Sequence, residues 1–278
     1  MEATLQPLAC PICGGGLIWS GEREETTEGV PAHGARCDDC GRFAPEEQGY
    51  LDMVNGVAVP PSGLGPRLMH VPPVAKIYER YWRPAFVTAT ARGRISFEQE
   101  LVLVERFLHL AEGGVVLDLS CGPGLFGRRL ARSKRFEAVY ALDRSRVMLE
   151  KCQAHCEEEG VEGLHLIWGD AHKLPFKDNR LAGIHAGFAI HLWDDPPRII
   201  EECTRALAPG GVFVASTMLR PFGGAVGETV SKLSRDLAGV QLFTEGELRA
   251  MCHRADLRRF YAVTRGGFVV FRAEKSVS

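Results

Sequence analysis

The sequence lacks the features that would place it in a membrane or on a nucleic acid. None of its apolar runs approaches the roughly 18 residues needed to cross a bilayer, and its first residues do not form the basic and apolar regions of a secretory signal. Basic charge is not in excess, because 33 lysines and arginines face 35 aspartates and glutamates. We therefore expect a cytoplasmic protein without a membrane span, and the overall charge argues against a nucleic-acid partner.

Internal repeats and low-complexity tracts are also missing. The 278 residues are 45% hydrophobic and 24% charged, which suits one folded catalytic domain with a small appendage. The nine cysteines are an odd number, and only four of them form CxxC pairs, so a disulfide framework is not expected. This cysteine usage fits a reducing compartment.

The two CxxC pairs predict a metal site near the N-terminus. Cys10-Pro-Ile-Cys13 and Cys37-Asp-Asp-Cys40 are short turns that present four thiolates, with glycines behind each pair that let the backbone fold back. The loop between the pairs is somewhat longer than is usual for zinc, and a redox CxxC or surface thiols are the alternative. We expect a zinc ribbon whose metal is structural, because four thiolates leave no position open for water. His33 is a spare ligand candidate, although a solvated loop histidine is the simpler interpretation.

The stretch from Val115 to Asp143 predicts half of a nucleotide-binding α/β unit. It reads as an apolar strand, a glycine turn, a helix from Leu125 to Ala131, and a second apolar strand. Gly122 and Gly124 allow a sharp bend and a close approach of a ligand to the backbone. The GxGxxG pattern alone is weak evidence and would suit NAD or FAD equally well.

Two carboxylates bear on which nucleotide-like ligand the unit binds. Asp118, at the end of the first strand, would repel the pyrophosphate of a dinucleotide by roughly a few kcal/mol in a partly dry cleft. S-adenosylmethionine (SAM) carries no phosphate, and its ammonium and sulfonium groups are cationic, so Asp118 favours SAM. Asp143, at the tip of the second strand, stands where a carboxylate accepts hydrogen bonds from ribose hydroxyls, and NAD would be served equally well there.

At this point the sequence resembles the class I SAM-dependent methyltransferases. Asp118-Leu-Ser-Cys-Gly122-Pro-Gly124 resembles their first motif, and Trp168-Gly-Asp170-Ala171 resembles the motif whose acid holds the adenine amino group. Ala186 falls at the end of the fourth strand, and Leu207-Ala-Pro-Gly-Gly211 resembles the turn into the fifth. The resemblance implies SAM contacts from Asp118, Ser120, Cys121, Gly122, Gly124, Asp143, Arg144, Gly169, Asp170, Ala171 and Ala186.

The sequence departs from this family at two positions. Ser120 replaces the usual first glycine, from which we expect a turn without positive φ at that residue. Ala182 replaces the acid that is common at the start of the fourth strand, which leaves one polar contact unfilled.

Strands that alternate with helices and close with a hairpin predict a doubly wound α/β fold. We expect a Rossmann-like seven-stranded sheet with a C-terminal antiparallel hairpin, plus a small N-terminal zinc-ribbon domain. The expected divisions are a zinc ribbon at 1–59, a linker and aromatic lid segment at 60–97, and the methyltransferase domain at 98–278. Within the second segment, the pattern from Val74 to Phe86 predicts an amphipathic helix that ends near Pro84. This helix would either cover the substrate cleft as a lid or pack its aromatic side chains on the sheet.

Capping signals predict three helices of the catalytic part. Ser96 with Gln99 and Thr244 with Glu247 form capping-box patterns, and Ser145 can cap a helix that stops at Gly160. Gly223 to Leu242 is expected to be an inserted helix and loop before the helix that begins at Thr244. Cys152 and Cys156 share one helix face, and we expect them to be buried against the sheet rather than to bind metal.

A general base is needed only where the methyl acceptor must lose a proton. The candidates are His191, His185, Tyr78 and Tyr81. His191 follows the fourth strand, where the edge of the sheet opens into the ligand crevice. A structural hydrogen-bonding role explains His191 as well as the role of a general base does. Tyr78 and Tyr81 belong to the aromatic segment.

The run from His185 to Trp193, the CxxC pairs and Tyr78-Glu-Arg-Tyr-Trp together resemble the plastid and cyanobacterial-type relatives of ubiquinone and menaquinone C-methyltransferases. This resemblance implies a small-molecule acceptor that is hydrophobic or aromatic. Two alternatives stay open: a ribosomal RNA (guanine) methyltransferase with a cysteine zinc site, and a SAM-binding protein that does not transfer methyl. For RNA we would expect a basic ribbon. This one is acidic, with Glu22, Glu24, Glu25, Glu28, Asp38, Asp39, Glu46 and Glu47 against Arg23, Arg36 and Arg42.

Overall fold

The computed structural model describes residues 5–25, 31–54, 83–221 and 223–277. All described strands join one mixed sheet in the order β1-β2-β3-β4-β7-β6-β5-β8-β9-β11-β10. The expected lid residues Tyr78 and Tyr81, and most of the segment from Val74 to Phe86, lie outside the described residues.

Seven strands of this sheet form the predicted Rossmann-like core. They are β5 (Val115–Leu119), β6 (Ala138–Asp143), β7 (Leu164–Trp168), β8 (Leu181–Gly187), β9 (Leu207–Met218), β10 (Leu257–Arg265) and β11 (Phe268–Lys275). Strands β5 to β9 run parallel, and β11 lies antiparallel between β9 and β10. The doubly wound sheet with its C-terminal hairpin is therefore confirmed.

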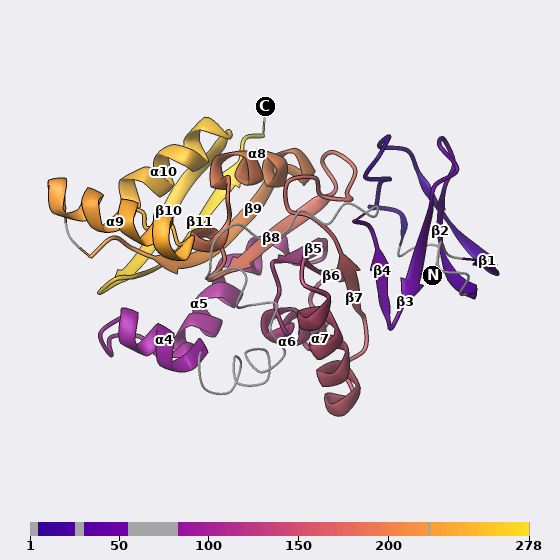
Figure 1. The fold of residues 1–278 in the computed structure, drawn as a ribbon, viewed down its shortest axis with the longest axis horizontal. Coiled ribbons are helices and arrows are strands. Elements are labelled where there is room, and N and C mark those ends of the chain that lie inside the picture. The colour runs from indigo at the N-terminus through magenta and orange to yellow at the C-terminus, as the bar shows by residue number, and fades with distance from the viewer. Residues whose placement is uncertain (1–4, 26–30, 55–82, 222, 278) are drawn as a thin grey trace.

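Helices cover both faces of the sheet, as Figure 1 shows. One face carries α4 (Arg83–Thr90), α5 (Phe97–Leu108), α6 (Leu125–Ser133) and α7 (Arg146–Glu159), and the short η2 (His109–Ala111) follows α5. The other face carries α8 (Pro196–Ala206) and α10 (Glu245–Arg254), while α9 (Gly224–Ala238) lies beside them after η3 (Ile190–Leu192). Apolar side chains from both helix layers pack against alternating residues of the strands, which is the expected burial of a two-sided parallel sheet.

The sequence predicted the helix caps well. Ser96 and Thr244 form complete capping boxes at the starts of α5 and α10. Ser145 caps α7, which ends at the left-handed Gly160 as expected. The helix predicted to end near Pro84 lies mostly outside the described residues. Helix α4 begins at Arg83 and has Pro84 in its first turn, where a proline loses no backbone hydrogen bond.

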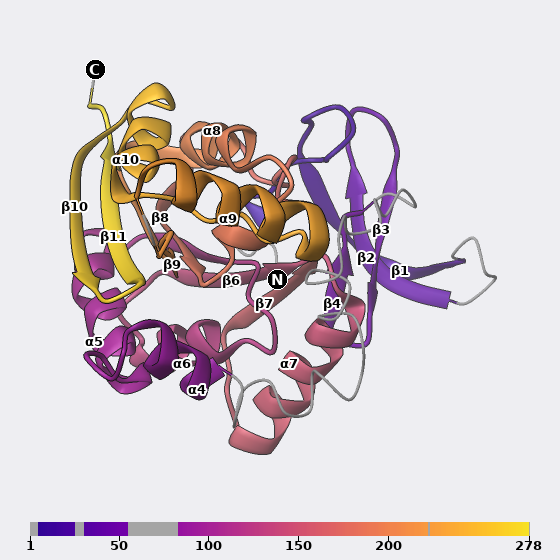
Figure 2. The same cartoon turned by 60° about the vertical axis from the view of Figure 1, so that its left-hand side comes forward.

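The N-terminal strands extend the catalytic sheet instead of standing apart from it. They are β1 (Leu17–Glu25), β2 (Pro31–Cys37), β3 (Phe43–Glu47) and β4 (Tyr50–Asp52). Strands β1 to β4 form an antiparallel meander, and β4 then pairs in parallel with β7. Figures 1 and 2 show the ribbon at one end of the sheet, next to β7.

The ribbon also shares its hydrophobic core with the catalytic part. Leu5, Leu8 and Met53 are buried in the same cluster as Ile167 and Phe176. At roughly 25 cal/mol per Å² of apolar surface removed from water, such a shared core stabilises both parts at once. The ribbon is therefore held against the sheet edge by backbone pairing and by apolar burial.

Candidate functional site

A cleft opens at the carboxyl ends of β5, β6, β7 and β8. The strand order reverses here, because the chain passes from β5 to β6 on one side and later returns to β8 on the other. Ligands of doubly wound sheets bind at such switch points. The lining consists of Ser120, Gly122, Leu142, Asp143, Arg144, Ser145, Met148, Gly169, Asp170, Ala171, His172, Gly187, Phe188, Ala189, Leu192, Trp193, Asp194 and Ile199.

Seven of the residues predicted to contact SAM line this cleft. They are Ser120, Gly122, Asp143, Arg144, Gly169, Asp170 and Ala171. The other four, Asp118, Cys121, Gly124 and Ala186, are not among the lining residues. The contacts of all eleven with SAM stay predictions.

Asp118 is buried beneath the glycine loop. Its Oδ2 accepts a hydrogen bond of 2.8 Å from the backbone N–H of Gly127 in the first turn of α6, and its Oδ1 lies 2.8 Å from Nδ1 of His185. Both oxygens are thus engaged within the protein. The carboxylate fixes α6 against β5 and β8, and so supports the loop from below.

The loop itself turns through three residues with positive φ. Ser120 has φ +56°, Gly122 +56° and Gly124 +81°. The expectation that serine at position 120 avoids positive φ is therefore wrong. The Ser120 hydroxyl accepts a hydrogen bond of 3.1 Å from the indole N–H of Trp193, which ties the β5 loop to the segment after β8 across the cleft.

Gly124 has no room for a side chain, and this gives a first prediction. A Cβ there would lie 2.0 Å from the Cys152 sulfur, whereas a Cβ at Gly113, with a similar φ of +78°, would meet nothing within 4 Å. Gly113→Ala should cost about 1 kcal/mol from the left-handed backbone alone. Gly124→Ala should cost roughly 2–4 kcal/mol, because overpacking adds to the same backbone strain. Urea denaturation of both variants measures the difference, and equal losses would contradict the packing argument.

Asp143 holds the loop from the cleft side. Its Oδ2 accepts from the backbone N–H of Gly122 and its Oδ1 from that of Ser145, both at 2.8 Å. Burial raises the pKa of this carboxyl above its ordinary value, and the two N–H groups oppose that rise. Asp143 lies at the end of β6 with its carboxylate facing the cleft, where it was predicted to meet ribose hydroxyls.

His172 is a cleft residue that the sequence analysis missed. Its Nδ1 lies 2.8 Å from Oδ1 of Asp170 and its Nε2 lies 3.0 Å from Oδ1 of Asp194. The imidazole therefore bridges the segments after β7 and β8. The hydrogen bond to Asp170 raises the pKa of His172, with help from the charge of Asp194. The sequence could have indicated His172 because it lies only two residues after Asp170. The contact with Asp194 could not be predicted in this way, because only the fold brings Asp194 to His172.

This bridge predicts a pH-dependent stability. The folded pKa of His172 lies above its ordinary value of 6.5, so the bridge contributes fully below about pH 6.5 and is lost as the pH rises through the raised pKa. His172→Ala should therefore lower the melting temperature at pH 6 and have less effect at pH 9. His109→Ala is the control, because His109 also faces a carboxylate, Glu112, but is largely exposed. A pH-independent loss in His172→Ala would contradict the prediction.

His191 is buried among apolar rings. Its Nδ1 lies 3.1 Å from the Thr217 hydroxyl, and its ring packs edge-on against Phe188. Burial lowers its pKa to about 3, with a further contribution from the positive charge of Arg83. His191 does not line the cleft, and this geometry favours the structural role over the base.

The four cysteines of the CxxC pairs come together as predicted. Their sulfur atoms all lie within 4.8 Å of one another, with Cys10 and Cys40 3.7 Å apart and Cys13 and Cys37 3.4 Å apart. Tetrahedral coordination with Zn–S bonds of ~2.3 Å places sulfur atoms about 3.8 Å apart. Gly14 and Gly41, which follow the second cysteine of each pair, have positive φ as the fold-back requires. The donor set and its spacing fit zinc, and His33 takes no part in the cluster.

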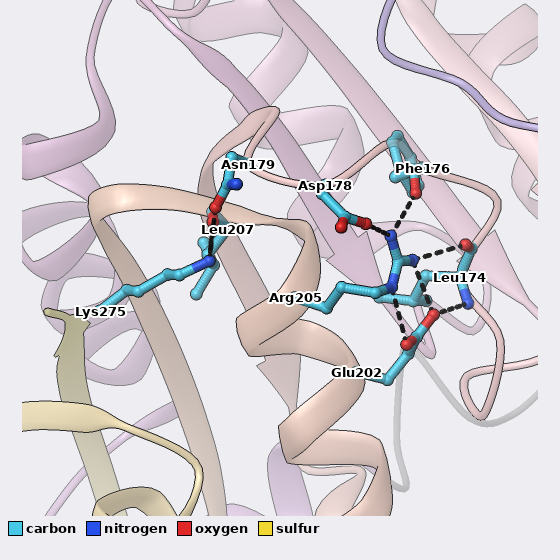
Figure 3. Close-up of polar contacts among 8 residues, drawn as sticks. All are labelled: Leu174, Phe176, Asp178, Asn179, Glu202, Arg205, Leu207 and Lys275. Carbon is cyan, nitrogen blue, oxygen red and sulfur yellow. Dashed lines mark hydrogen bonds and ion pairs between the residues drawn. The ribbon is translucent and has the colours of Figure 1, made fainter. Parts of the chain in front are cut away.

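The cysteine loop lies on the segment that follows His172. The backbone N–H of Ala9 donates to Pro175 and that of Lys177 donates to Pro7. Figure 3 shows how this segment is held from its other side by the guanidinium of Arg205 on α8, which donates to the carbonyls of Leu174 and Phe176. The segment that begins at the cleft is therefore clamped between the ribbon and α8.

Glu202 and Asp178 complete the clamp. Glu202 binds Arg205 through both oxygens and also accepts from the backbone N–H of Leu174. Asp178 lies 2.6 Å from the Arg205 guanidinium, and beside it Lys275 joins Asn179 to the start of β9. Arg205 and Glu202 thus satisfy the backbone polar groups of Leu174 and the carbonyl of Phe176, while the ribbon pairs with Pro175 and Lys177.

Comparisons with known proteins agree with this geometry. The family model described as a methyltransferase domain matches residues 117–215, the part of the chain that carries most of the cleft. A chloroplastic, uncharacterized methyltransferase of Arabidopsis thaliana is 32% identical over 96% of this chain and 78% of its own length. A demethylmenaquinone methyltransferase of Geobacillus stearothermophilus is 31% identical over 46% of this chain and 56% of its own length. Among solved structures, the [4+2]-cyclase SpnF superposes with a TM-score of 0.59 at 17% identity, covering 79% of this chain and 99% of that protein, which shows a shared fold.

Proposed function

Because the chain belongs to the class I SAM-dependent methyltransferases, we propose that it methylates a small hydrophobic or aromatic acceptor. SAM supplies a methyl group already activated by its sulfonium. The protein therefore has mainly to align the acceptor and to exclude water.

The part of the chain that the structure describes contains no helix with the length and apolar character of a membrane span.

We assign the cofactor contacts from the cleft lining. Asp143 would accept hydrogen bonds from the ribose hydroxyls, and Asp170 would accept one from the adenine amino group. Leu142, Met148 and Ile199 add apolar surface to the cleft. The groups present fit SAM, because the cleft offers carboxylates to hydroxyl and amino donors and apolar side chains to a purine.

The acceptor class is inferred from the part of the cleft that is lined by residues following β8. Phe188, Ala189, Leu192 and Trp193 line it, and Arg144 is the one lysine or arginine among the described lining residues. An RNA acceptor needs several cations for its phosphates, whereas an aromatic acceptor needs flat apolar surface. The lining therefore supports the small apolar acceptor.

We also propose that the four-cysteine cluster holds one structural zinc ion. Four thiolates fill a tetrahedral site, so the metal would have no position open for a substrate. Its contribution would be to fold the strands of the ribbon and to press the cysteine loop onto the segment after His172.

A direct test measures release of S-adenosylhomocysteine (SAH) from SAM with three acceptors: reduced demethylmenaquinone, a panel of simple phenols, and unmodified ribosomal RNA. We expect turnover with a quinol or a phenol and none with RNA. Turnover with RNA alone would overturn the proposed acceptor class. SAM binding without SAH release from any acceptor would contradict it too, and would favour a reaction other than methyl transfer.

A further inference from the structure

Three charged side chains form a bridge within the cleft lining. His172 lies between Asp170, which follows β7, and Asp194, which follows η3, and its two ring nitrogens approach Oδ1 of these residues at 2.8 and 3.0 Å. All three residues line the cleft. The side chains of Asp170, His172 and Asp194 are 30%, 24% and 35% exposed, so each still contacts water that a ligand in the cleft would displace.

The two contacts depend on the protonation state of the imidazole. Carboxylates only accept hydrogen bonds, and a neutral imidazole carries a single N–H. A neutral His172 can therefore donate to one aspartate but turns a lone pair toward the other. The imidazolium carries an N–H on both ring nitrogens and can donate to both, so the bridge is complete only when His172 is charged.

The charges around His172 favour this form. The hydrogen bond to Asp170 raises the pKa of His172 and burial opposes it, while the charges of Asp170 and Asp194 raise it further. Arg144, which follows β6 and lines the cleft, opposes protonation by less than either carboxylate favours it. Lys173, the next residue along the chain, donates to the carbonyl of Ile12 in the ribbon.

The Asp170 end of the bridge leaves one carboxylate oxygen for the cofactor. Its Oδ1 accepts from the backbone N–H of His172 at 2.9 Å as well as from the ring. Its Oδ2 has no hydrogen-bond partner among the residues that the structure describes. Because two donors fix Oδ1, the carboxylate keeps one orientation, and Oδ2 is left for the adenine amino group that we assign to Asp170.

The Asp194 end belongs to the wall of the cleft that we assign to the acceptor. Asp194 directly follows Trp193, a lining residue whose indole N–H donates to Ser120. The carbonyls of Trp193 and Asp194 both accept from the side chain of Gln241, at 2.7 and 3.2 Å, so the segment after α9 also holds this turn. His172 thus links the adenine end of the cleft to the acceptor wall.

Cofactor binding should favour the charged form of His172. Adenine on Asp170 would displace water from the bridge, and removing charged groups from water costs free energy unless they are paired. Two carboxylates with an imidazolium carry one net negative charge, whereas with a neutral ring they carry two. The bridge in the complex should therefore hold its proton more tightly than the bridge in the free protein.

We propose that His172 is a positioning residue that couples cofactor binding to the acceptor wall, so that adenine on Asp170 draws one proton onto the imidazole and secures its contact with Asp194. This inference rests on the proposed function, because it takes Asp170 as the adenine site. The coupling is reciprocal, since a charged His172 raises the affinity for adenine by the same factor as adenine raises the proton affinity of His172. The affinity for the cofactor should then fall as the pH rises above the pKa of His172 in the free protein, which exceeds 6.5.

The first test is a calorimetric titration of the full-length protein with 5′-methylthioadenosine. This probe has the adenine, ribose and sulfur of SAM but no group that titrates between about pH 5 and 9, whereas the amino group of SAM titrates near pH 8. Titrations in buffers of different ionisation enthalpy give the number of protons taken up. Above the pKa of His172 in the free protein, we expect uptake of up to about one proton per site and an affinity that falls by up to about tenfold per pH unit.

Two variants identify the group that takes up the proton. His172→Gln keeps an amide donor but cannot gain a proton, so uptake should vanish and the affinity should no longer depend on pH. Asp194→Asn keeps an acceptor for Nε2 without its charge, so the affinity should begin to fall at a lower pH. His109→Gln is the matched control, because His109 also pairs with a carboxylate, Glu112, outside the cleft, and its uptake should equal that of the wild type.

Hydrogen exchange reports on the coupling to the acceptor wall. In the wild type, saturating 5′-methylthioadenosine should slow exchange in residues 188–194 as well as around Asp170. In His172→Gln it should protect the segment around Asp170 and leave residues 188–194 unchanged. Equal protection of residues 188–194 in the two proteins would overturn the coupling.

The remaining outcomes separate this inference from the proposed function. Binding without proton uptake from about pH 6 to 9, or equal uptake in the wild type and His172→Gln, would overturn the coupling and leave the cofactor assignment standing. If His172→Gln is too unstable to titrate, Asp194→Asn decides, and an unchanged pH dependence there would overturn the coupling. If neither SAM nor 5′-methylthioadenosine binds at any pH, the proposed function fails and the coupling fails with it.

Discussion

Replacing Asp143 with asparagine is expected to weaken SAM binding by roughly 10- to 100-fold, because a hydrogen bond to a charged group contributes about 1.5–3 kcal/mol. Asparagine keeps the size of the side chain but offers a donor where the carboxylate accepts. It would also lose one of the two backbone contacts to Gly122 and Ser145, so the loop should loosen as well. Calorimetric titration with SAM measures the effect.

Asp195→Asn is the matched control for this substitution. Asp195 caps α8 from an exposed position outside the cleft, and asparagine caps helices about as well as aspartate does. We expect wild-type affinity for SAM in that variant. Wild-type affinity in Asp143→Asn as well would contradict the placement of the ribose at the end of β6.

Replacing Cys10 and Cys13 together with serine should have the largest effect on folding. Zinc binding contributes about 10–16 kcal/mol to the folding of small zinc domains, and two ligands out of four would be lost. We expect the zinc content to fall from about one ion per chain to none. Hydrogen exchange should then become fast in β1 to β3, which lie farthest from the catalytic sheet.

The SAM site should survive the loss of zinc in weakened form. The segment after His172 would lose its contacts with Pro7 and Ala9, but Arg205 would still hold it from α8. We therefore expect the affinity for SAM to fall by less than tenfold. Cys156→Ser is the control, because it removes a thiol of α7 and leaves the cluster intact. Native protein that contains no zinc would contradict the metal assignment.

The sequence predicted the elements whose signals are local. The capping boxes at Ser96 and Thr244, and the stop at Gly160, depend on residues within a few positions of one another. The four cysteines were likewise found from spacing alone, because two CxxC turns leave few other ways to satisfy the thiolates. The glycine loop after the Val115 strand also predicted that the cleft would open at the carboxyl ends of the parallel strands, where the structure has it.

Features that depend on distant partners were not predictable in this way. Ser120 adopts positive φ at a position where the local sequence gives no glycine, and its hydroxyl meets Trp193 only in the fold. The pairing of β4 with β7 joins residues that are far apart in the chain, so the ribbon looked separate in the sequence. The bridge from His172 to Asp194 has the same origin, because its two ends follow different strands.

The most direct test of the central claim is a calorimetric titration of the purified protein with SAM, with SAH and with NAD, after mass spectrometry of any small molecule that copurifies. A cleft built for SAM predicts one site per chain with micromolar affinity for SAM or SAH, and no heat from NAD. Tight binding of NAD without binding of SAM or SAH would contradict the assignment, and the proposed acceptor class would fall with it.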